Sequence, residues 1–369
     1  MQNDSEERIS ARQATRLFLI AAAAPIIRIV PSYTAQYSKK AGAISAVISF
    51  GLCILIAIFF AKMFNDKRLK ITSMENAFES AYGKIFSKVL LVIVLIMQLV
   101  IMATRLRVFT ERIQTLVFTE TVPILLMIVF MATAFAICKI RLKFIARFAE
   151  LLEAVLVVAF SVVILICLQN FNITNIYPVT YYDIPGALHG VVAFVGIMAL
   201  YSYVFYLGDS IKDKEELLKY GKSAAKIFCV TGLGLIFITT GVFGYRVVAA
   251  FSQPFFMTLK SANILGVFEG IESIFVTFWT IADYAMVIYH LIISGVLLKK
   301  IFNLESRLTM IAPVVFVTYI ISFSLSKNFF MITQFTDYII LPLNIFIGLV
   351  LPMITYGVLK IKDKVKQLN

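Results

Sequence analysis

Residues 21–31 read AAAAPIIRIVP, an apolar run that contains Pro25, Arg28 and Pro31. Each proline removes a backbone donor and clashes with the preceding helical turn, and lipid cannot satisfy the carbonyl groups that are freed. An arginine inside a membrane needs a partner or a polar cavity. We therefore predict that the helix is unwound here, at a functional segment. The alternative is a simple proline kink with an arginine that snorkels outward.

The composition of the whole chain predicts that this run lies in a membrane. Of its 369 residues, 60% are hydrophobic and 15% are charged, whereas soluble domains average about 45–50% and about 25%. A water-soluble globule could not bury so much apolar surface. The chain is therefore predicted to be an all-α polytopic membrane protein, with membrane lipid as its main partner.

Several function classes are excluded by what the sequence lacks. The net charge of +13 comes from short basic clusters between apolar runs, which is typical of membrane topology rather than of nucleic-acid binding. Two histidines and four cysteines leave little material for a metal cluster, and the cysteines are expected to be reduced packing residues. No nucleotide-binding, hydrolase or metalloprotease motif is present. We expect no enzyme activity, no cofactor and no nucleic-acid partner.

A membrane-spanning helix needs about 20 mostly apolar residues. The sequence predicts ten such spans in a single transmembrane domain, residues 1–369. The two long connections, 65–85 and 209–223, are polar and are predicted to be partly helical. A folded loop is predicted at 250–268. The spans are 14–37, 43–64, 86–111, 119–138, 146–169, 186–208, 224–249, 269–298, 306–326 and 335–359.

The basic residues predict the orientation of these spans. The segments that connect the ten spans lie alternately on the two sides of the membrane. The segments on one side carry 25 of the 34 lysines and arginines, those on the other side carry 6, and the remaining 3 lie within spans. Cytoplasmic segments carry the excess of positive charge. Both termini are therefore predicted to be cytoplasmic, and no cleavable signal peptide is recognised at the start.

The sixth span carries a second feature that interrupts a helix. Gly196 is followed by Ala199-Leu200-Tyr201-Ser202-Tyr203, and glycine in a membrane helix often marks close packing, which is the alternative interpretation. However, spans one and six each open a set of five helices. An odd number of helices gives the two halves opposite orientations, and interrupted helices at matching places indicate a ligand site near the midplane. The repeats are predicted at about 12–169 and 186–360.

Asp283 lies about 14 residues into the eighth span, which is about 21 Å of helix at 1.5 Å per residue. Such a carboxylate must be paired, hydrated or protonated. We expect its partner to be Arg28, or a cation or water cluster shared with the broken segment of the first span. We name Asp283 and Glu153 as candidates for ion or proton coupling. Structural pairing alone is the alternative for Asp283.

The remaining buried charges are predicted to have plainer roles. Arg105 and Arg107 are expected to snorkel from the outer end of the third span, and Glu111 and Arg112 to lie at the surface there. Glu150 is expected to pair with Arg147, and His290 to make a polar contact near the inner interface.

Three sets of residues resemble one known family. These are Pro31-Ser32 followed by Lys40-Ala41-Gly42, the segment IARFAELLE at 145–153, and Pro254 followed by Ala262, Gly266, Glu269, Phe275 and Trp279. They are similar to the B subunits of bacterial spore germinant receptors, which belong to the amino acid–polyamine–organocation superfamily. The resemblance runs over nearly the whole chain, although each motif is short.

This resemblance implies a LeuT-like fold of ten helices in two inverted repeats, with helices one and six broken. It implies a nutrient-sensing subunit in the spore inner membrane, beside A-type and C-type subunits, that binds a small germinant such as an amino acid. The implied ligand site comprises Ala24, Pro25, Ile26, Ile27, Arg28, Gln98, Met102, Gly196, Leu200, Tyr201, Trp279 and Asp283. The family normally has glycine where Ala24 stands; Arg28 offers a substitute, because a guanidinium can bind a carboxylate bidentately.

Two other functions stay open from the sequence. An ion- or proton-coupled amino acid transporter would use the same fold to move its ligand. A purely structural membrane subunit would bind no ligand.

The charge pattern generates a prediction about topology. A cysteine placed at Thr180, in a connection predicted to be external, is expected to react with a membrane-impermeant thiol reagent in sealed cells. Protection from the reagent at normal expression would contradict the predicted orientation.

Overall fold

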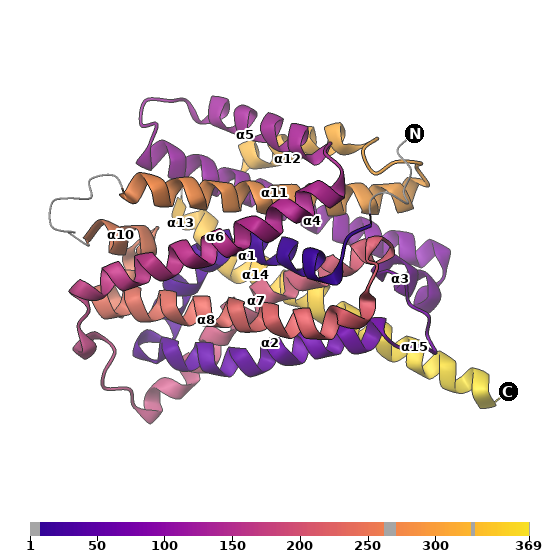
Figure 1. Ribbon diagram of the computed structural model, residues 1–369, viewed down its shortest axis with the longest axis horizontal. Coiled ribbons are helices and arrows are strands. Elements are labelled where there is room, and N and C mark those ends of the chain that lie inside the picture. The colour runs from indigo at the N-terminus through magenta and orange to yellow at the C-terminus, as the bar shows by residue number, and fades with distance from the viewer. Residues whose placement is uncertain (1–7, 262–270, 326–328, 369) are drawn as a thin grey trace.

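The computed structural model describes residues 8–261, 271–325 and 329–368, and these residues are almost entirely helical (Figure 1). The elements in chain order are α1 (Ala11–Tyr37), η2 (Lys39–Ala41), α2 (Gly42–Phe64), α3 (Met74–Tyr82), α4 (Lys84–Leu116), α5 (Pro123–Cys138), α6 (Leu142–Cys167), η3 (Leu168–Asn170), η4 (Ile173–Asn175), η5 (Tyr181–Asp183), α7 (Ile184–Met198), η6 (Ala199–Ser210), η7 (Lys214–Glu216), α8 (Leu217–Phe243), α9 (Tyr245–Ala250), α10 (Pro254–Ser261), α11 (Ile271–Phe302), α12 (Ile311–Ser324), α13 (Phe329–Phe335), η8 (Thr336–Ile340), α14 (Leu341–Ile345), η9 (Phe346–Val350) and α15 (Leu351–Leu368).

The polytopic all-α architecture is confirmed. Eight helical segments of the described chain are long and apolar enough to cross a membrane, and two shorter apolar helices, α5 and α12, lie where the fourth and ninth spans were predicted. Large apolar side chains such as Val47, Leu55 and Ile85 face outward, as expected of a surface in contact with lipid. Because α5 and α12 have only 16 and 14 residues, the count of ten spans stays a prediction.

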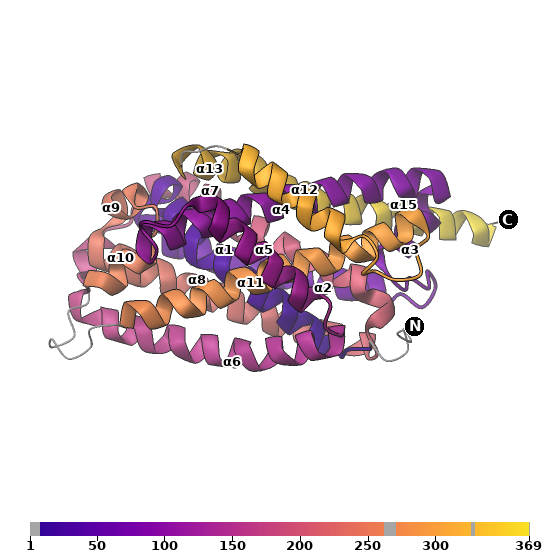
Figure 2. The same cartoon turned by 90° about the horizontal axis from the view of Figure 1, so that it is seen from above.

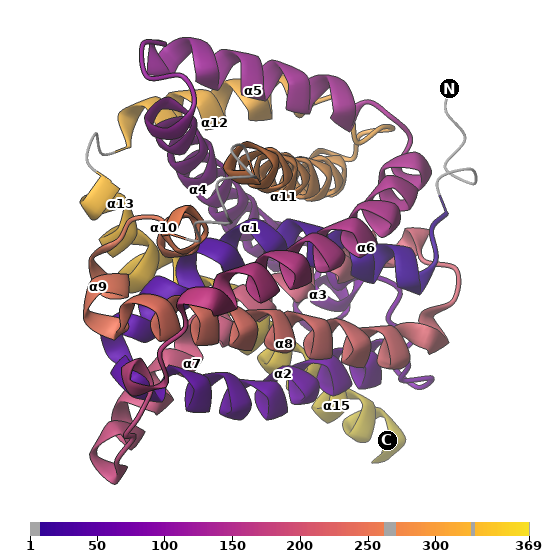
Figure 3. The same cartoon turned by 60° about the vertical axis from the view of Figure 1, so that its left-hand side comes forward.

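Helix α1 lies in the middle of the bundle, as the end-on view shows (Figure 3). It packs against α6, α7, α8 and α11, and nearly all of its side chains are buried. It runs as one continuous helix through Pro25 and Pro31, which differs from the unwound segment that the sequence predicted. Neighbouring helices on all sides hold the helical path, and the carbonyl groups freed by the prolines face protein rather than lipid.

The long helices form two packed groups. Helices α1, α2, α7 and α8 pack against one another, and α4, α5, α11 and α12 form the second group. Helix α6 contacts both α1 and α8 and runs along the side of the molecule opposite to α12 and α13 (Figure 2). The first two long helices of each predicted repeat, α1 with α2 and α7 with α8, thus lie in the same group. The inverted repeat itself stays a prediction.

The sixth predicted span changes its helical type midway. It is an α-helix to Met198 and a 3₁₀-helix from Ala199 to Ser210, although such helices seldom exceed four residues. Close packing accompanies the change: a Cβ on Gly196 would meet Leu341 Cδ2 at 2.8 Å, and a Cβ on Gly348 would meet the carbonyl oxygen of Ala199 at 2.5 Å. Gly196 therefore lies in a closely packed contact, as the alternative interpretation of this glycine predicted.

The last predicted span contains two π-helical turns, η8 and η9, which the sequence did not indicate. Such turns widen a helix locally and occur frequently at functional sites. Here η8 brings Thr336 and Asp337 to the interior of the bundle, where both are buried.

The connections hold the ends of the helices in place. A parallel backbone bridge joins Ile9 to Ile211, and Asp213 accepts a hydrogen bond of 2.6 Å from the backbone N–H of Ala11. The predicted partly helical connections are confirmed, since α3 lies within 65–85 and η7 within 209–223. The predicted loop 250–268 contains α10, and Ala262, Gly266 and Glu269 lie outside the described residues.

The contact between η6 and η9 generates a prediction about stability. Gly348→Ala places its Cβ against backbone, which cannot move aside as a side chain can, so we expect a loss of about 1–3 kcal/mol in the free energy of unfolding. Gly51→Ala is the control: no atom lies within 4 Å of the added Cβ, and alanine is favoured over glycine in a helix by about 1 kcal/mol. Equal thermal stability of the two variants in detergent would contradict this packing.

Candidate functional site

Two polar stripes face each other between α4 and α11, the long helices at the core of the second group. Gln98, Arg105 and Arg112 follow one another at intervals of seven residues on α4, and this spacing keeps them on one side of the helix. Asp283 and His290 have the same spacing on α11. All five residues are buried, so their charges and hydrogen-bonding groups must find partners inside the bundle.

The ion pair between Arg112 and Asp283 joins these helices. Arg112 Nη2 bonds Asp283 Oδ2, and the two side chains are only 1% and 5% exposed. The guanidinium also lies over the Trp279 ring, 4.4 Å from its centroid. The prediction that Arg112 lies at the surface is therefore wrong, as is the prediction that Arg28 is the direct partner of Asp283. The span continues to Leu116, several residues beyond its predicted end.

Farther along the same stripes, Gln98 Oε1 and His290 Nδ1 form a buried hydrogen bond. Tyr203 of η6 packs beside the imidazole, with ring centroids 5.8 Å apart. Among the described residues, neither Gln98 Nε2 nor His290 Nε2 finds a hydrogen-bond partner. The polar contact predicted for His290 is present, and the side chain is fully buried in the bundle.

Arg28 of α1 points toward the last predicted span. Its Nη2 donates a hydrogen bond of 3.3 Å to Thr336 Oγ1, and its Nε has no partner. Asp337 is close enough to interact electrostatically with it. The side chain is only 4% exposed, which excludes outward snorkelling in this structure. The predicted polar environment of Arg28 is therefore present, although the helix around it is not unwound.

Arg105 completes the cluster of buried charges. It is 5% exposed, so the prediction that it snorkels to the surface is wrong, whereas Arg107 is half-buried. Arg105 lies within electrostatic range of Arg28 and Asp283. We call Arg28, Arg105, Arg112, Asp283 and Asp337 the arginine cluster. It combines three guanidinium groups with two carboxyl groups.

The other predicted ligand residues lie outside this cluster. Ala24, Pro25, Ile26 and Ile27 are buried along α1, and Met102 is buried on α4. Tyr201 packs against Phe18, with ring centroids 5.2 Å apart, and the carbonyl oxygen of Leu200 accepts a hydrogen bond of 3.2 Å from Tyr289. The structure thus places Arg28 within electrostatic range of Asp283 and Trp279 against Arg112. The contacts given for Gly196, Leu200 and Tyr201 are with other residues.

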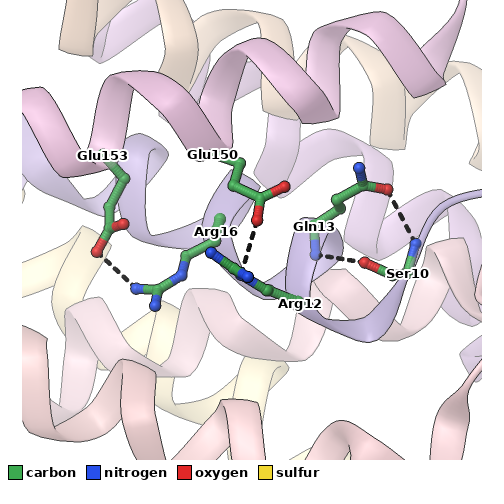
Figure 4. Close-up of polar contacts among 6 residues, drawn as sticks. All are labelled: Ser10, Arg12, Gln13, Arg16, Glu150 and Glu153. Carbon is green, nitrogen blue, oxygen red and sulfur yellow. Dashed lines mark hydrogen bonds and ion pairs between the residues drawn. The ribbon is translucent and has the colours of Figure 1, made fainter.

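Glu153 and Glu150 tie α6 to the start of α1. Arg16 Nη1 lies 2.5 Å from Glu153 Oε1, and Arg12 Nε lies 2.7 Å from Glu150 Oε1, next to the capping box of Ser10 and Gln13 (Figure 4). The predicted pairing of Glu150 with Arg147 is therefore wrong. Glu153 already has a cationic partner, which weakens the case for it as a coupling group.

Sequence reasoning missed Arg105, Arg112 and Asp337 as site residues. For Arg105 and Arg112 the sequence did contain a usable signal. Both follow Gln98 at intervals of seven residues, so once Gln98 is assigned to the buried side of the helix, they are assigned to it as well. Asp337 carried no such signal, since it reaches the interior through a π-helical turn.

The central ion pair generates a quantitative prediction. Arg112→Met or Asp283→Asn alone leaves a buried unpaired charge and should cost about 3–5 kcal/mol of the free energy of unfolding. The double variant should lose less than the sum of the two, and a double-mutant cycle measures the difference. The pair Arg12–Glu150 is the control, because its side chains are 53% and 26% exposed and such pairs are worth about 0–1 kcal/mol. Additive losses for the buried pair would contradict its assignment.

Comparisons with known proteins agree with this architecture. Solved structures with the same fold include a nucleobase-cation-symport-1 family transporter in a closed conformation with bromovinylhydantoin bound, at a TM-score of 0.60 and 12% identity over 95% of this chain and 78% of that one. A Na⁺-coupled sialic acid symporter matches at a TM-score of 0.63 and 11% identity, over 94% and 80% of the two chains. A manganese transporter of Eremococcus coleocola matches at 0.55 and 15%, over 96% and 85%.

These likenesses establish the LeuT-like transporter fold, and the family follows from the sequence. No curated protein matches the chain significantly. The family described as spore germination protein, a family of permeases, matches residues 8–330. The chain therefore belongs to the spore germination protein family of membrane permeases.

Proposed function

We propose that this protein is the nutrient-sensing membrane subunit of a spore germinant receptor and that it binds a small carboxylate-bearing germinant, such as an amino acid, at the arginine cluster. Family membership and the transporter fold support a transporter-like membrane protein. The ligand would contact Arg28 on α1 and Arg105 on α4, so that it joins the two helix groups.

The charge balance of the arginine cluster carries this proposal. Asp283 is engaged by Arg112, and Asp337 interacts with Arg28 without forming an ion pair within the described residues. Glu111 also acts on Arg28, and it acts on Arg107 as well. With these two counted, four guanidinium groups face three carboxyl groups among the described residues, so one guanidinium is left in excess in an interior where an unpaired charge is costly. Arg28 Nε is also buried without a partner. A carboxylate supplies the missing negative charge and accepts two parallel hydrogen bonds from a guanidinium.

Such a ligand can transmit a signal because it contacts both helix groups. If α1 can pack against α4 and α11 in two ways, the ligand favours the packing to which it binds more tightly. The shift in free energy equals the difference in its binding free energy between the two packings. In the proposed receptor, A-type and C-type subunits respond to that change in the spore inner membrane, with both termini of this chain in the cytoplasm.

The ligand proposal predicts a specific thermal shift. A binding amino acid present at a concentration of 100 times its Kd should raise the free energy of unfolding of the purified protein by about 2.7 kcal/mol. The amine with the same side chain but no carboxylate should give no shift. Arg28→Lys keeps the charge but loses the bidentate geometry, so the apparent Kd should rise about tenfold, which corresponds to about 1.4 kcal/mol.

Arg68→Lys is the matched control, because Arg68 is exposed in the connection before α3. It should leave the Kd unchanged. Equal affinity for the amino acid and its amine would contradict recognition through the carboxylate. The absence of any shift across the common amino acids would favour a structural subunit.

An ion- or proton-coupled amino acid transporter is the second candidate, favoured by the likeness of the fold to symporters. Uptake of the stabilising amino acid into proteoliposomes separates the two functions. A receptor binds without accumulating its ligand, whereas a coupled transporter concentrates it against a gradient.

A further inference from the structure

A polar hollow of about 940 Å³ opens among residues 72–76, 206–210 and 296–308, none of which belongs to the arginine cluster. It is enclosed by α3, the end of η6, the end of α11 and the segment 303–308. These are segments that the charge pattern predicts to be cytoplasmic. Among the described residues that line it are Ser73, Glu75, Asp209, Lys299, Lys300 and Glu305.

Glu75 differs from the other carboxyl groups at the hollow. It lies in the first turn of α3 and is only 4% exposed, and its Oε2 is buried without a hydrogen-bond partner. The nearby cation Lys300 is engaged by Glu79 one turn farther along α3, at 2.9 Å. A carboxylate buried without a cation is costly, so the group favours its neutral form.

The charges around Glu75 act in opposite directions, and burial decides the outcome. Asp209 and Tyr206 approach it from η6, and Lys300 approaches it from α11. On the other side of α3, Lys84 and Lys88 of α4 act on Glu79, and Lys362 of α15 donates to the carbonyl oxygens of Ser80 and Ala81. Glu305 and Arg307 line the far wall of the hollow. Burial, together with the negative charge of Asp209, raises the pKa of Glu75 to about 8, although hydrogen bonds from its own backbone N–H and from Ser73, and the charge of Lys300, favour the carboxylate.

We propose that Glu75 is a proton-binding site that exchanges with the water of the polar hollow. Its carboxylate takes one proton from water to become a neutral carboxylic acid, and it returns the proton when α3 and η6 separate enough to hydrate the charge. Protonation thus favours the packing of α3 against η6. The two carboxyl groups first considered for coupling, Asp283 and Glu153, both have arginine partners, whereas Glu75 has a free oxygen on a polar hollow.

The sign of the pH dependence follows from the direction of the shift. Between the ordinary value of 4.5 and about 8, the folded protein holds a proton that the unfolded chain has released. Stability therefore falls as the pH rises through this window. Glu75→Gln cannot ionise, so its melting temperature should match that of the wild type at low pH and exceed it at high pH.

Infrared spectroscopy of the purified full chain tests the proposal directly. The C=O stretching band of a protonated carboxylic acid should lose one component as the pH rises from about 6 to about 9. That component should be missing in Glu75→Gln and retained in Glu79→Gln, the control one turn away. An unchanged band in Glu75→Gln at neutral pH would overturn the proposal.

A second variant keeps the test decisive if Glu75→Gln does not fold. Asp209→Asn leaves Glu75 in place and removes the neighbouring negative charge, so the component should disappear at a lower pH than in the wild type. A midpoint that does not move would overturn the proposal. Both readouts are independent of amino acid binding, so failure here is distinguishable from failure of the germinant site.

Discussion

Compensation of buried charge between α4 and α11 is the constraint on which the interior of this protein depends. Arg112 and Asp283 neutralise each other in the interior of the bundle, where their side chains are 1% and 5% exposed, and Trp279 lies against the guanidinium. Removing either partner leaves a buried charge without its ion-pair partner. This pair fixes the position of α11 against α4, and the central helix α1 then presents Arg28 to the same interior.

The pairing of Arg112 with Asp283 determines how the other buried charges are balanced. Because Asp283 is engaged by Arg112, it balances Arg105 only at longer range, and Arg28 is balanced by Asp337 and Glu111 without forming an ion pair with either among the described residues. The cluster is therefore suited to an anion. At the start of α1, two ion pairs to α6 tie down the other end of the same helix. Within the described part of the chain, Glu75 Oε2 has no hydrogen-bond partner. The cationic interior, suited to a carboxylate, is thus distinct from the proposed proton-binding site at the polar hollow.

Hydropathy was enough to predict the polytopic fold, since eight long apolar helical segments and two shorter apolar helices of the described chain lie where spans were predicted. The importance of Arg28 also followed from the sequence, because two prolines flank a charge in an apolar run. Three features could not be predicted. The ends of long helices are not marked by hydropathy, so Arg112 was placed at the surface. The continuity of α1 depends on neighbours that surround it on all sides. The π-helical turn that brings Asp337 inward is a product of tertiary packing.

The central claim is that a ligand carboxylate supplies the negative charge that the arginine cluster lacks. A cryo-EM structure of the full chain with a stabilising amino acid tests it most directly. The account predicts ligand density between α1 and α4, with the carboxylate within hydrogen-bonding distance of Arg28 and Arg105 and with the Arg112–Asp283 pair intact. A ligand bound elsewhere, with Arg28 and Arg105 contacting only protein, would contradict it.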